Sequence, residues 1–225
     1  MATAAAASKS KSRIFIVEDH PVFREGLVRL VNTENDLEVC GEAGDFEKGL
    51  RGIKQFKPDL ALVDLKLPGK SGLDLIKKVR ALKLAVKLLV VSMYDEALYA
   101  DRVLRAGGDG YIMKEESPDE TIHAIRDVLD GHIYVSEEVM ASHSKPSAKP
   151  VAKTGKRPLD LLTDLELNIL ELLGQGKNNA EIARQLRQKA KQINNYSVQM
   201  RKKLKLKTNN ALIRYAVCWV ETGET

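Results

Sequence analysis

Residues 60–72 read LALVDLKLPGKSG, in which a run of four apolar residues ends directly on Asp64. A short apolar run without polar alternation is typical of a parallel strand that is covered on both faces. Similar runs recur along the first half of the chain, at residues 14–17, 37–40, 88–91 and 111–113. Amphipathic stretches separate them, so strand and helix patterns alternate five times. We therefore expect an α/β fold, with a doubly wound five-stranded parallel sheet, helices on both faces and right-handed crossovers.

The composition of the chain changes along its length and predicts two domains. Residues 134–158 are rich in serine, proline, lysine and alanine and contain few large apolar residues, which is typical of a flexible linker. Residues 1–12 contain an alanine run and are expected to form a disordered tail. A first domain over residues 13–133 and a second over residues 159–225 remain.

The two halves of the chain differ in charge. Lysine and arginine number 36 against 31 acidic residues, which gives a net charge of +5. Residues 1–135 carry 20 basic and 22 acidic side chains, whereas residues 136–225 carry 16 basic and 9 acidic ones. Residues 187–207 hold eight of these basic side chains and no acidic one. A basic block is often only a solvated surface, but it also suits a polyanionic partner.

Several classes of protein do not fit the sequence. With 44% hydrophobic and 30% charged residues, the chain is not expected to be disordered throughout. Cys40 and Cys218 belong to no C-x-x-C or Cys/His cluster, so we expect no disulfide scaffold and no zinc site, and both side chains to be buried. No apolar run reaches the ~18 residues of a membrane span, and the first residues lack a signal-peptide pattern. We expect a cytoplasmic protein without a membrane partner.

Polar residues follow four of the five apolar runs. Glu18 and Asp19 follow the first run, Asp64 the third, Ser92 the fourth and Lys114 the fifth. The carboxyl ends of strands in an open parallel sheet converge on one crevice, where ligands bind. We therefore expect these residues to share one site.

The residue types of this expected site favour phosphoryl chemistry on a carboxylate. Three carboxylates in one crevice repel one another unless a cation neutralises them, and Mg²⁺ prefers oxygen ligands. A carboxylate beside Mg²⁺ can attack phosphorus and form an aspartyl phosphate. Lys114 would then contact the phosphoryl oxygens, and Ser92 would donate a hydrogen bond to one of them. A lone aspartate after a strand is most often a turn or cap residue, so the hypothesis depends on the whole set.

The second half of the chain has a wholly helical pattern. Residues 163–166, Thr-Asp-Leu-Glu, form a capping box that opens a helix through Leu173. Residues 178–181 cap a short second helix, and further helices are expected over about residues 191–204 and 210–220. We expect these short helices to form a small all-α bundle.

The third of these helices has two different faces. At 3.6 residues per turn, Ile193, Met200 and Leu204 share one face, with Ser197 among them. The other side carries amides, lysines and a valine, namely Lys191, Gln192, Asn194, Asn195, Val198, Gln199 and Lys202. Amides can bond base edges, a valine can contact a thymine methyl group and lysines can reach phosphates. The helix therefore suits the major groove of double-stranded DNA, although a solvated polar face would have the same composition.

Three motifs in the first domain resemble those of a known family. They are Phe15-Ile16-Val17-Glu18-Asp19-His20-Pro21, residues 63–72 and Gly110-Tyr111-Ile112-Met113-Lys114. Over residues 13–133 the chain resembles the receiver domain of two-component response regulators. This resemblance implies a flavodoxin-like sheet with strand order 2-1-3-4-5.

The receiver resemblance also implies roles for the site residues. Asp64 would be phosphorylated by a sensor histidine kinase, and Glu18, Asp19 and Asp64 would hold Mg²⁺. Three further residues would respond to the phosphoryl group: Lys114 by contact, Ser92 by moving toward it, and Tyr111 by swinging inward behind Ser92 as a switch. A strand residue packed at the sheet edge would explain Tyr111 almost as well.

The second domain carries three segments that resemble another family. They are residues 162–166, 176–183 and 203–207. Over residues 159–220 the chain resembles the LuxR-type helix-turn-helix of NarL/FixJ response regulators. This resemblance implies a dimeric DNA-binding transcription regulator. Six residues of the third helix would contact DNA, with Asn194, Asn195 and Val198 facing bases and Gln192, Gln199 and Lys202 beside them.

We interpret the chain as a phosphorylation-controlled transcription regulator and not as an enzyme. Its expected partners are a sensor histidine kinase, double-stranded DNA, a second copy of the chain on phosphorylation and, as a further candidate, RNA polymerase. One alternative is a phosphatase or phosphotransferase that forms an aspartyl phosphate; such enzymes often use a second acid where this chain has Lys66. Another is a DNA binder that does not depend on phosphorylation. RNA is a third possible target, but it usually needs stacking aromatic residues.

Overall fold

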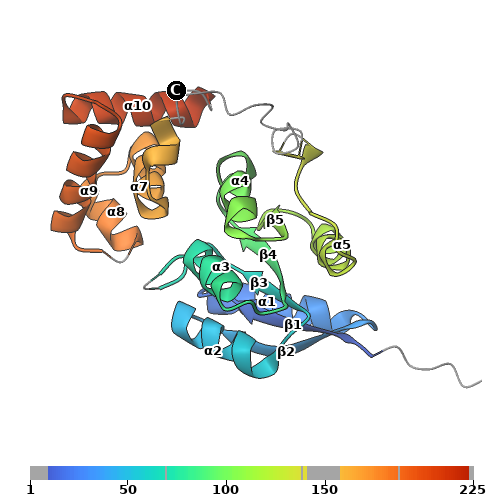
Figure 1. Cartoon of the computed structure of the whole chain (residues 1–225). Helices are drawn as coiled ribbons and strands as arrows, with labels where there is room; N and C mark the ends of the chain where they lie inside the picture. Colours follow the sequence, from blue (N-terminus) through green and yellow to red (C-terminus); the bar gives the residue numbers. More distant parts are fainter. Residues whose placement is uncertain (1–9, 69, 138, 141–157, 187, 223–225) are drawn as a thin grey trace, which may run out of the picture. The chain divides into compact units, whose positions relative to one another are not determined.

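The computed structural model describes residues 10–68, 70–137, 139–140, 158–186 and 188–222. The chain divides into two compact units, Met1–Pro146 and Ser147–Thr225 (Figure 1). Most of the predicted tail and most of the predicted linker lie outside the described residues. Among the residues described, no helix is both long and apolar enough to span a membrane.

The first unit is a parallel sheet of five strands in the order β2-β1-β3-β4-β5. The strands are β1 (Ser12–Val17), β2 (Leu37–Ala43), β3 (Leu60–Val63), β4 (Lys87–Ser92) and β5 (Gly110–Met113). The helices between and after them are α1 (Pro21–Thr33), α2 (Phe46–Phe56), α3 (Gly72–Ala81), α4 (Glu96–Ala106) and α5 (Pro118–Leu129). The predicted α/β class and strand order are confirmed.

Helices cover both faces of this sheet, as continuous apolar strands require. On one face, Leu27 of α1 and Ile125 of α5 share a buried core with Ile14 and Ile16 of β1. On the other face α2 lies so close that a Cβ atom added to Gly52 would come within 2.1 Å of the Phe15 ring. The central strands are therefore buried on both sides, and their carboxyl ends are held rigidly.

The connection from β3 to α3 is tight and positions Asp64. A Cβ atom at Gly72 would lie only 2.1 Å from the carbonyl oxygen of Asp64, so no larger residue fits there without a shift of the backbone. Ser71 caps α3, since its hydroxyl accepts a hydrogen bond from the Asp74 amide at 3.2 Å. The loop that follows Asp64 is thus short and fixed at its far end.

The boundaries of the first unit are wider than predicted at both ends. Ser12 was expected in the tail, but its amide donates to the Asp36 carbonyl at 2.8 Å as the first residue of β1. Tyr134 was expected in the linker, but its carbonyl accepts a hydrogen bond from the Tyr111 amide at 2.7 Å, in a bridge beside β5. Both residues belong to the first unit because their backbones pair with the sheet, and such pairing leaves no signal in the composition.

The second unit is all-helical, as predicted. Its elements are the 3₁₀ turn η1 (Pro158–Leu161) and helices α7 (Asp164–Gly174), α8 (Asn179–Gln185), α9 (Ala190–Lys203) and α10 (Asn209–Thr222). Thr163 and Glu166 form the expected capping box of α7, and Asn178 caps α8. Their core includes Ile182, Ile193 and Trp219, all buried.

The expected burial of both cysteines is wrong. Cys40 is half-buried, and its thiol donates to the Ile14 carbonyl at 3.3 Å. Cys218 is exposed on α10. A small apolar side chain within a helical pattern does not reveal which face of the helix it occupies.

Candidate functional site

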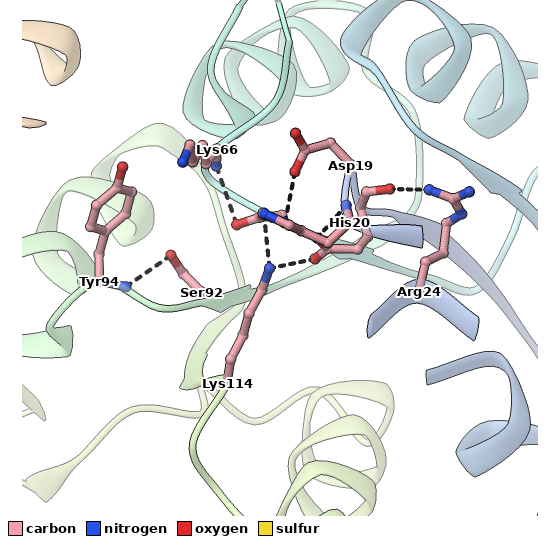
Figure 2. A network of polar contacts seen from close by, with 9 residues as sticks. Asp19, His20, Arg24, Lys66, Ser92, Tyr94 and Lys114 are labelled. Atoms are coloured by element: carbon pink, nitrogen blue, oxygen red, sulfur yellow. Dashed lines mark hydrogen bonds and ion pairs between the residues drawn. The ribbon is translucent and has the colours of Figure 1, made fainter. Parts of the chain in front are cut away.

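The polar residues that follow the strands of the first unit lie together, at the carboxyl edge of the sheet (Figure 2). Glu18 and Asp19 follow β1, Asp64 follows β3, Ser92 ends β4 and Lys114 follows β5. These four strands are neighbours in the sheet, so their ends open on the same crevice. The expected convergence is present.

Lys114 links two carboxylates at the centre of the site. Its Nζ lies 2.9 Å from Asp64 Oδ2 and 2.6 Å from Glu18 Oε2. The side chains of Lys114, Glu18 and Asp64 are only 4%, 2% and 3% exposed. One buried ammonium group thus serves two buried carboxylates, which leaves an excess of negative charge.

The pKa of Asp64 is raised from its ordinary value of 3.8 to about 6. Burial is the largest cause and the charge of Glu18 the next, while Lys114 acts in the opposite direction. The Lys66 amide also favours the ionised form, since it donates to Asp64 Oδ1 at 3.2 Å. Because burial and Glu18 disfavour the ionised form of Asp64, an additional cation would stabilise that form.

His20, which was not among the predicted site residues, faces the same carboxylates. Its Nδ1 lies 2.9 Å from Asp19 Oδ1 and 3.0 Å from Glu18 Oε1, and its backbone amide also donates to Glu18 Oε1, at 2.9 Å (Figure 2). Three consecutive residues with ligand atoms, Glu-Asp-His directly after a strand, were the signal available in the sequence.

The residues present fit a divalent cation. Ligand atoms of Glu18, Asp19, His20 and Asp64 all lie within 4.8 Å of one another. Two of these three carboxylates share one lysine, Lys114, so a doubly charged ion would help to balance the local charge. A set dominated by carboxylate oxygens is what Mg²⁺ accepts.

Ser92 and Tyr111 are joined through the loop between β4 and α4. Ser92 is fully buried, and its hydroxyl oxygen accepts a hydrogen bond from the Tyr94 amide at 3.2 Å. The hydroxyl group of Tyr111, a residue that is 1% exposed, donates to the Tyr94 carbonyl at 2.7 Å. Tyr111 is thus turned inward and contacts the loop that starts at Ser92, in the inward position that the receiver resemblance implies, and its role as a switch stays a prediction.

In the second unit, α9 has the two faces that the sequence predicted. Ile193, Ser197 and Met200 are buried, whereas Leu204 at the end of the helix is only half-buried. The predicted DNA-contacting side chains are all exposed, namely Gln192, Asn194, Asn195, Val198, Gln199 and Lys202.

Two of these exposed amides also have local contacts. The Asn179 side chain of α8 donates to Asn194 Oδ1, and Gln192 Oε1 accepts a hydrogen bond from the Lys189 amide at 3.0 Å. Gln192 therefore contributes to the start of α9 in addition to any contact with DNA. Asn179 was missed because a contact between two helices leaves no local pattern.

Comparison with known families identifies both units. A family model for the response regulator receiver domain matches residues 14–126. The chain belongs to the two-component response regulators. A second model, for bacterial regulatory proteins of the luxR family, matches residues 160–216. This response regulator therefore combines a receiver domain with a LuxR-type DNA-binding domain, as the sequence predicted.

Individual relatives agree with this assignment. The response regulator is 34% identical over 210 residues to the oxygen regulatory protein NreC of Staphylococcus aureus (strain MRSA252), a match that covers 91% of this chain and 96% of NreC. A LuxR-family two-component response regulator from Aurantimonas sp. SI85-9A1 is 32% identical with a TM-score of 0.55, over 59% of this chain and 94% of the other. RcsB of Salmonella typhimurium shares the fold, with 23% identity and a TM-score of 0.57 over 92% of this chain and 100% of RcsB.

Proposed function

We propose that Asp64 is the residue on which this response regulator is phosphorylated, by a sensor histidine kinase, and that the modification controls binding of the second unit to DNA. One observation carries the proposal: Asp64 is a buried carboxylate that shares a single lysine with Glu18, at the edge of the sheet where ligands bind. A structural aspartate in this position would be expected to have a lowered pKa, whereas that of Asp64 is raised to about 6.

The chemistry assigned to this chain is the transfer of one phosphoryl group. An Asp64 oxygen attacks the phosphorus of a phosphohistidine, the P–N bond breaks, and the imidazole leaves with the electron pair and takes up a proton. Lys114 Nζ, already 2.9 Å from Asp64 Oδ2, would move onto the new phosphoryl oxygens. Glu18, Asp19 and Asp64 are the proposed holders of Mg²⁺, which when bound supplies positive charge for the phosphoryl oxygens. The Ser92 hydroxyl would donate a hydrogen bond to one of the phosphoryl oxygens.

A chain of contacts links this chemistry to the segment that leaves the receiver, which we call the exit segment (residues 134–137). The loop between Ser92 and α4 is tied to β5 through the Tyr111 hydroxyl. The backbone of Tyr111 pairs with Tyr134, and Glu96 Oε1 at the start of α4 accepts a hydrogen bond from the Ser136 amide at 2.7 Å. A rearrangement of this loop would therefore change the contacts of the exit segment, which continues along the chain toward the DNA-binding unit.

For DNA recognition we assign base contacts to Asn194, Asn195 and Val198, and contacts nearer the phosphates to Gln192, Gln199 and Lys202. Solved structures include an RcsB–DNA complex and RcsB dimers bound to DNA, and the same mode, as a homodimer on paired half-sites, is proposed for this chain. Double-stranded DNA is favoured over RNA because the second unit has three aromatic residues for stacking, of which Trp219 is 2% exposed and Tyr196 and Tyr215 are half-buried. RNA polymerase as a contact and the cytoplasm as the compartment stay predictions.

The enzymatic alternative predicts turnover. A phosphatase or phosphotransferase would release phosphate from many equivalents of a phosphomonoester, whereas a regulator would hold about one phosphoryl group per chain. The position two residues after Asp64 is Lys66, whose amide contacts Asp64 Oδ1. A lysine there is a poor proton donor for a leaving group at neutral pH. This favours a regulator.

The test is phosphorylation of the full chain with a small phosphodonor and Mg²⁺, followed by measurement of acid-stable, base-labile phosphate and by intact mass. We expect about one phosphoryl group on the wild-type chain and none on Asp64→Asn. Asp119→Asn, which changes an exposed aspartate in the first turn of α5, is the matched control and should be labelled like the wild type. Labelling of Asp64→Asn at the wild-type level would overturn the proposal.

A further inference from the structure

His20 occupies an unusual position at the start of α1. It is the N-cap residue of that helix, with Pro21 next to it, yet its side chain makes no capping hydrogen bond. The imidazole instead turns toward the carboxylates, so that Nδ1 lies 2.9 Å from Asp19 Oδ1 and 3.0 Å from Glu18 Oε1. The side chain of this N-cap residue therefore places a nitrogen atom in the acidic crevice and does not cap the helix.

The atoms that face His20 are different from those that face Lys114. Lys114 contacts Oε2 of Glu18 and Oδ2 of Asp64, whereas His20 contacts the other oxygen of Glu18 and an oxygen of Asp19. The crevice therefore has a side where the ammonium group already compensates the carboxylates. On the other side, one imidazole nitrogen and two carboxylate oxygens converge.

The separations on this second side suit neighbouring ligands of one small cation. Adjacent ligands of an octahedral ion with bonds of about 2.1 Å are about 3.0 Å apart. The measured separations between Nδ1 and the two carboxylate oxygens are 2.9 and 3.0 Å. Little rearrangement of these side chains is needed for one metal ion to bind all three atoms.

A nitrogen ligand changes which metal such a site prefers. Mg²⁺ takes oxygen ligands almost exclusively, whereas imidazole suits first-row transition ions. The geometry points to His20 as a ligand that determines metal selectivity, so that this crevice binds a divalent first-row transition ion, with Mn²⁺ as the probe, in preference to Mg²⁺. The inference rests on the metal site of the proposed function and adds a nitrogen ligand, whose share of the Mn²⁺ affinity carboxylates alone would not supply.

The experiment is calorimetric titration of the full chain with Mn²⁺ and separately with Mg²⁺, together with pulsed electron paramagnetic resonance of the bound Mn²⁺. We expect the wild type to bind Mn²⁺ at least about tenfold more tightly than Mg²⁺ and to show coupling to an imidazole nitrogen. His20→Gln should lose about tenfold or more in Mn²⁺ affinity and lose the nitrogen coupling, with little change in Mg²⁺ affinity. Because the His20 side chain is 53% exposed, the variant should fold normally.

His123→Gln is the matched control. His123 is a surface histidine on α5 with acidic neighbours, Glu120 and Asp127 at 3.9 and 3.8 Å, and its removal should change neither metal affinity nor nitrogen coupling. Equal losses of Mn²⁺ and Mg²⁺ affinity in His20→Gln, or no loss, would overturn the inference and leave the proposed metal site standing. Metal affinity that survives Asp19→Asn unchanged would instead contradict the metal site itself, and with it the role of His20.

Discussion

Each unit of this response regulator contains a buried carboxylate beside a lysine, and the two pairs differ in how that lysine is shared. In the receiver, Lys114 is shared between Asp64 and Glu18. In the DNA-binding unit, Lys203 contacts one carboxylate among the described residues, that of Glu166, and the amide and hydroxyl of Thr163 each donate to the same carboxylate at 2.8 Å. Asp64 therefore shares its lysine with Glu18 and accepts a further hydrogen bond from the Lys66 amide, whereas Glu166 accepts from Lys203 and from two groups of Thr163.

The pKa values of the two carboxyl groups move in opposite directions as a result. That of Asp64 is raised to about 6 by burial and by the charge of Glu18. Burial also pushes the pKa of Glu166 upward, but hydrogen bonds from Lys203 and Thr163 outweigh it and hold the pKa below its ordinary value. Burial beside a lysine is thus common to both carboxyl groups, and the hydrogen bonds to Glu166 set the direction of its shift apart from that of Asp64.

The largest predicted effect comes from removing each lysine. Lys114→Met should destabilise the receiver by about 3 kcal/mol at pH 7.5 without metal, because two buried carboxylates lose the lysine that they share. Lys203→Met should destabilise the DNA-binding unit by about 2 kcal/mol, since Lys203 is 34% exposed and water can replace it in part. Denaturant unfolding measures both effects, with tyrosine circular dichroism dominated by the receiver and the fluorescence of Trp219 reporting the other unit.

Mg²⁺ provides the internal control for that pair of variants. A few millimolar Mg²⁺ should recover much of the stability lost in Lys114→Met and none of that lost in Lys203→Met, because only the receiver crevice is proposed to bind the ion. Equal recovery of both units, or of neither, would remove the distinction between the two sites.

Neutralising the two carboxylates should change the free energy of unfolding of the two units in opposite directions. Asp64→Asn should stabilise the receiver by about 1 to 3 kcal/mol at pH 7.5 without metal, because it removes a buried negative charge that the folded state disfavours. Glu166→Gln should destabilise the DNA-binding unit by about 1 kcal/mol, since an amide is a weaker acceptor for Lys203. Calorimetric unfolding of the full-length variants tests both signs.

The pH dependence of stability should follow the same contrast. The folded pKa of Asp64 lies above its ordinary value, so its contribution is fully present below about pH 3.8 and is lost as the pH rises through about 6. The folded pKa of Glu166 lies below its ordinary value of 4.5, so its contribution is present above that pH and is lost as the pH falls below it. In Asp64→Asn the stability of the receiver should no longer fall as the pH rises through about 6. In Glu166→Gln the stability of the DNA-binding unit should no longer fall in the same way as the pH drops below 4.5.

The sequence predicted those features that local patterns encode. Apolar runs that end on Glu18, Asp64 and Lys114 were sufficient to expect one crevice, because strand order in such a sheet brings those ends together. Helix starts were equally visible, since the caps of α7 and α8 are local motifs. These parts of the fold and the site depend on spacing along the chain.

Other features depend on contacts between distant segments and could not be predicted. The bridge of Tyr134 to β5 and the contact of Asn179 with Asn194 join residues on different elements. The orientation of His20 was equally hidden, because an N-cap residue usually bonds its own helix. The competition of two carboxylates for Lys114, on which the comparison of the two units depends, belongs to this group.

A smaller effect is expected at the contact between α4 and the exit segment. Glu96→Ala removes the acceptor of the Ser136 amide, and we expect the gain in DNA affinity on phosphorylation to fall by about fivefold. Phosphate incorporation should be unchanged, because Glu96 does not touch Asp64. A variant that keeps the full gain in a DNA-binding titration would show that the exit segment does not transmit the signal through this bond.

The smallest predicted effects lie on α9 and separate base contacts from phosphate contacts. Val198→Ala should cost about 1 kcal/mol on DNA with the preferred base and less on other sequences. Lys202→Ala should weaken binding to all sequences alike and lower the salt dependence of log affinity by about one unit. Titrations on two DNA sequences at several salt concentrations distinguish the two patterns, and identical behaviour of the variants would contradict the assigned faces.

The most direct test of the account is the affinity of the full chain for a DNA duplex selected from a random pool, measured with and without a small phosphodonor in the presence of Mg²⁺. For the wild type we predict an increase of about tenfold or more with the phosphodonor, and for Asp64→Asn no increase. An equal increase in both proteins, or none in the wild type, would contradict the claim that the crevice around Asp64 controls the DNA-binding unit.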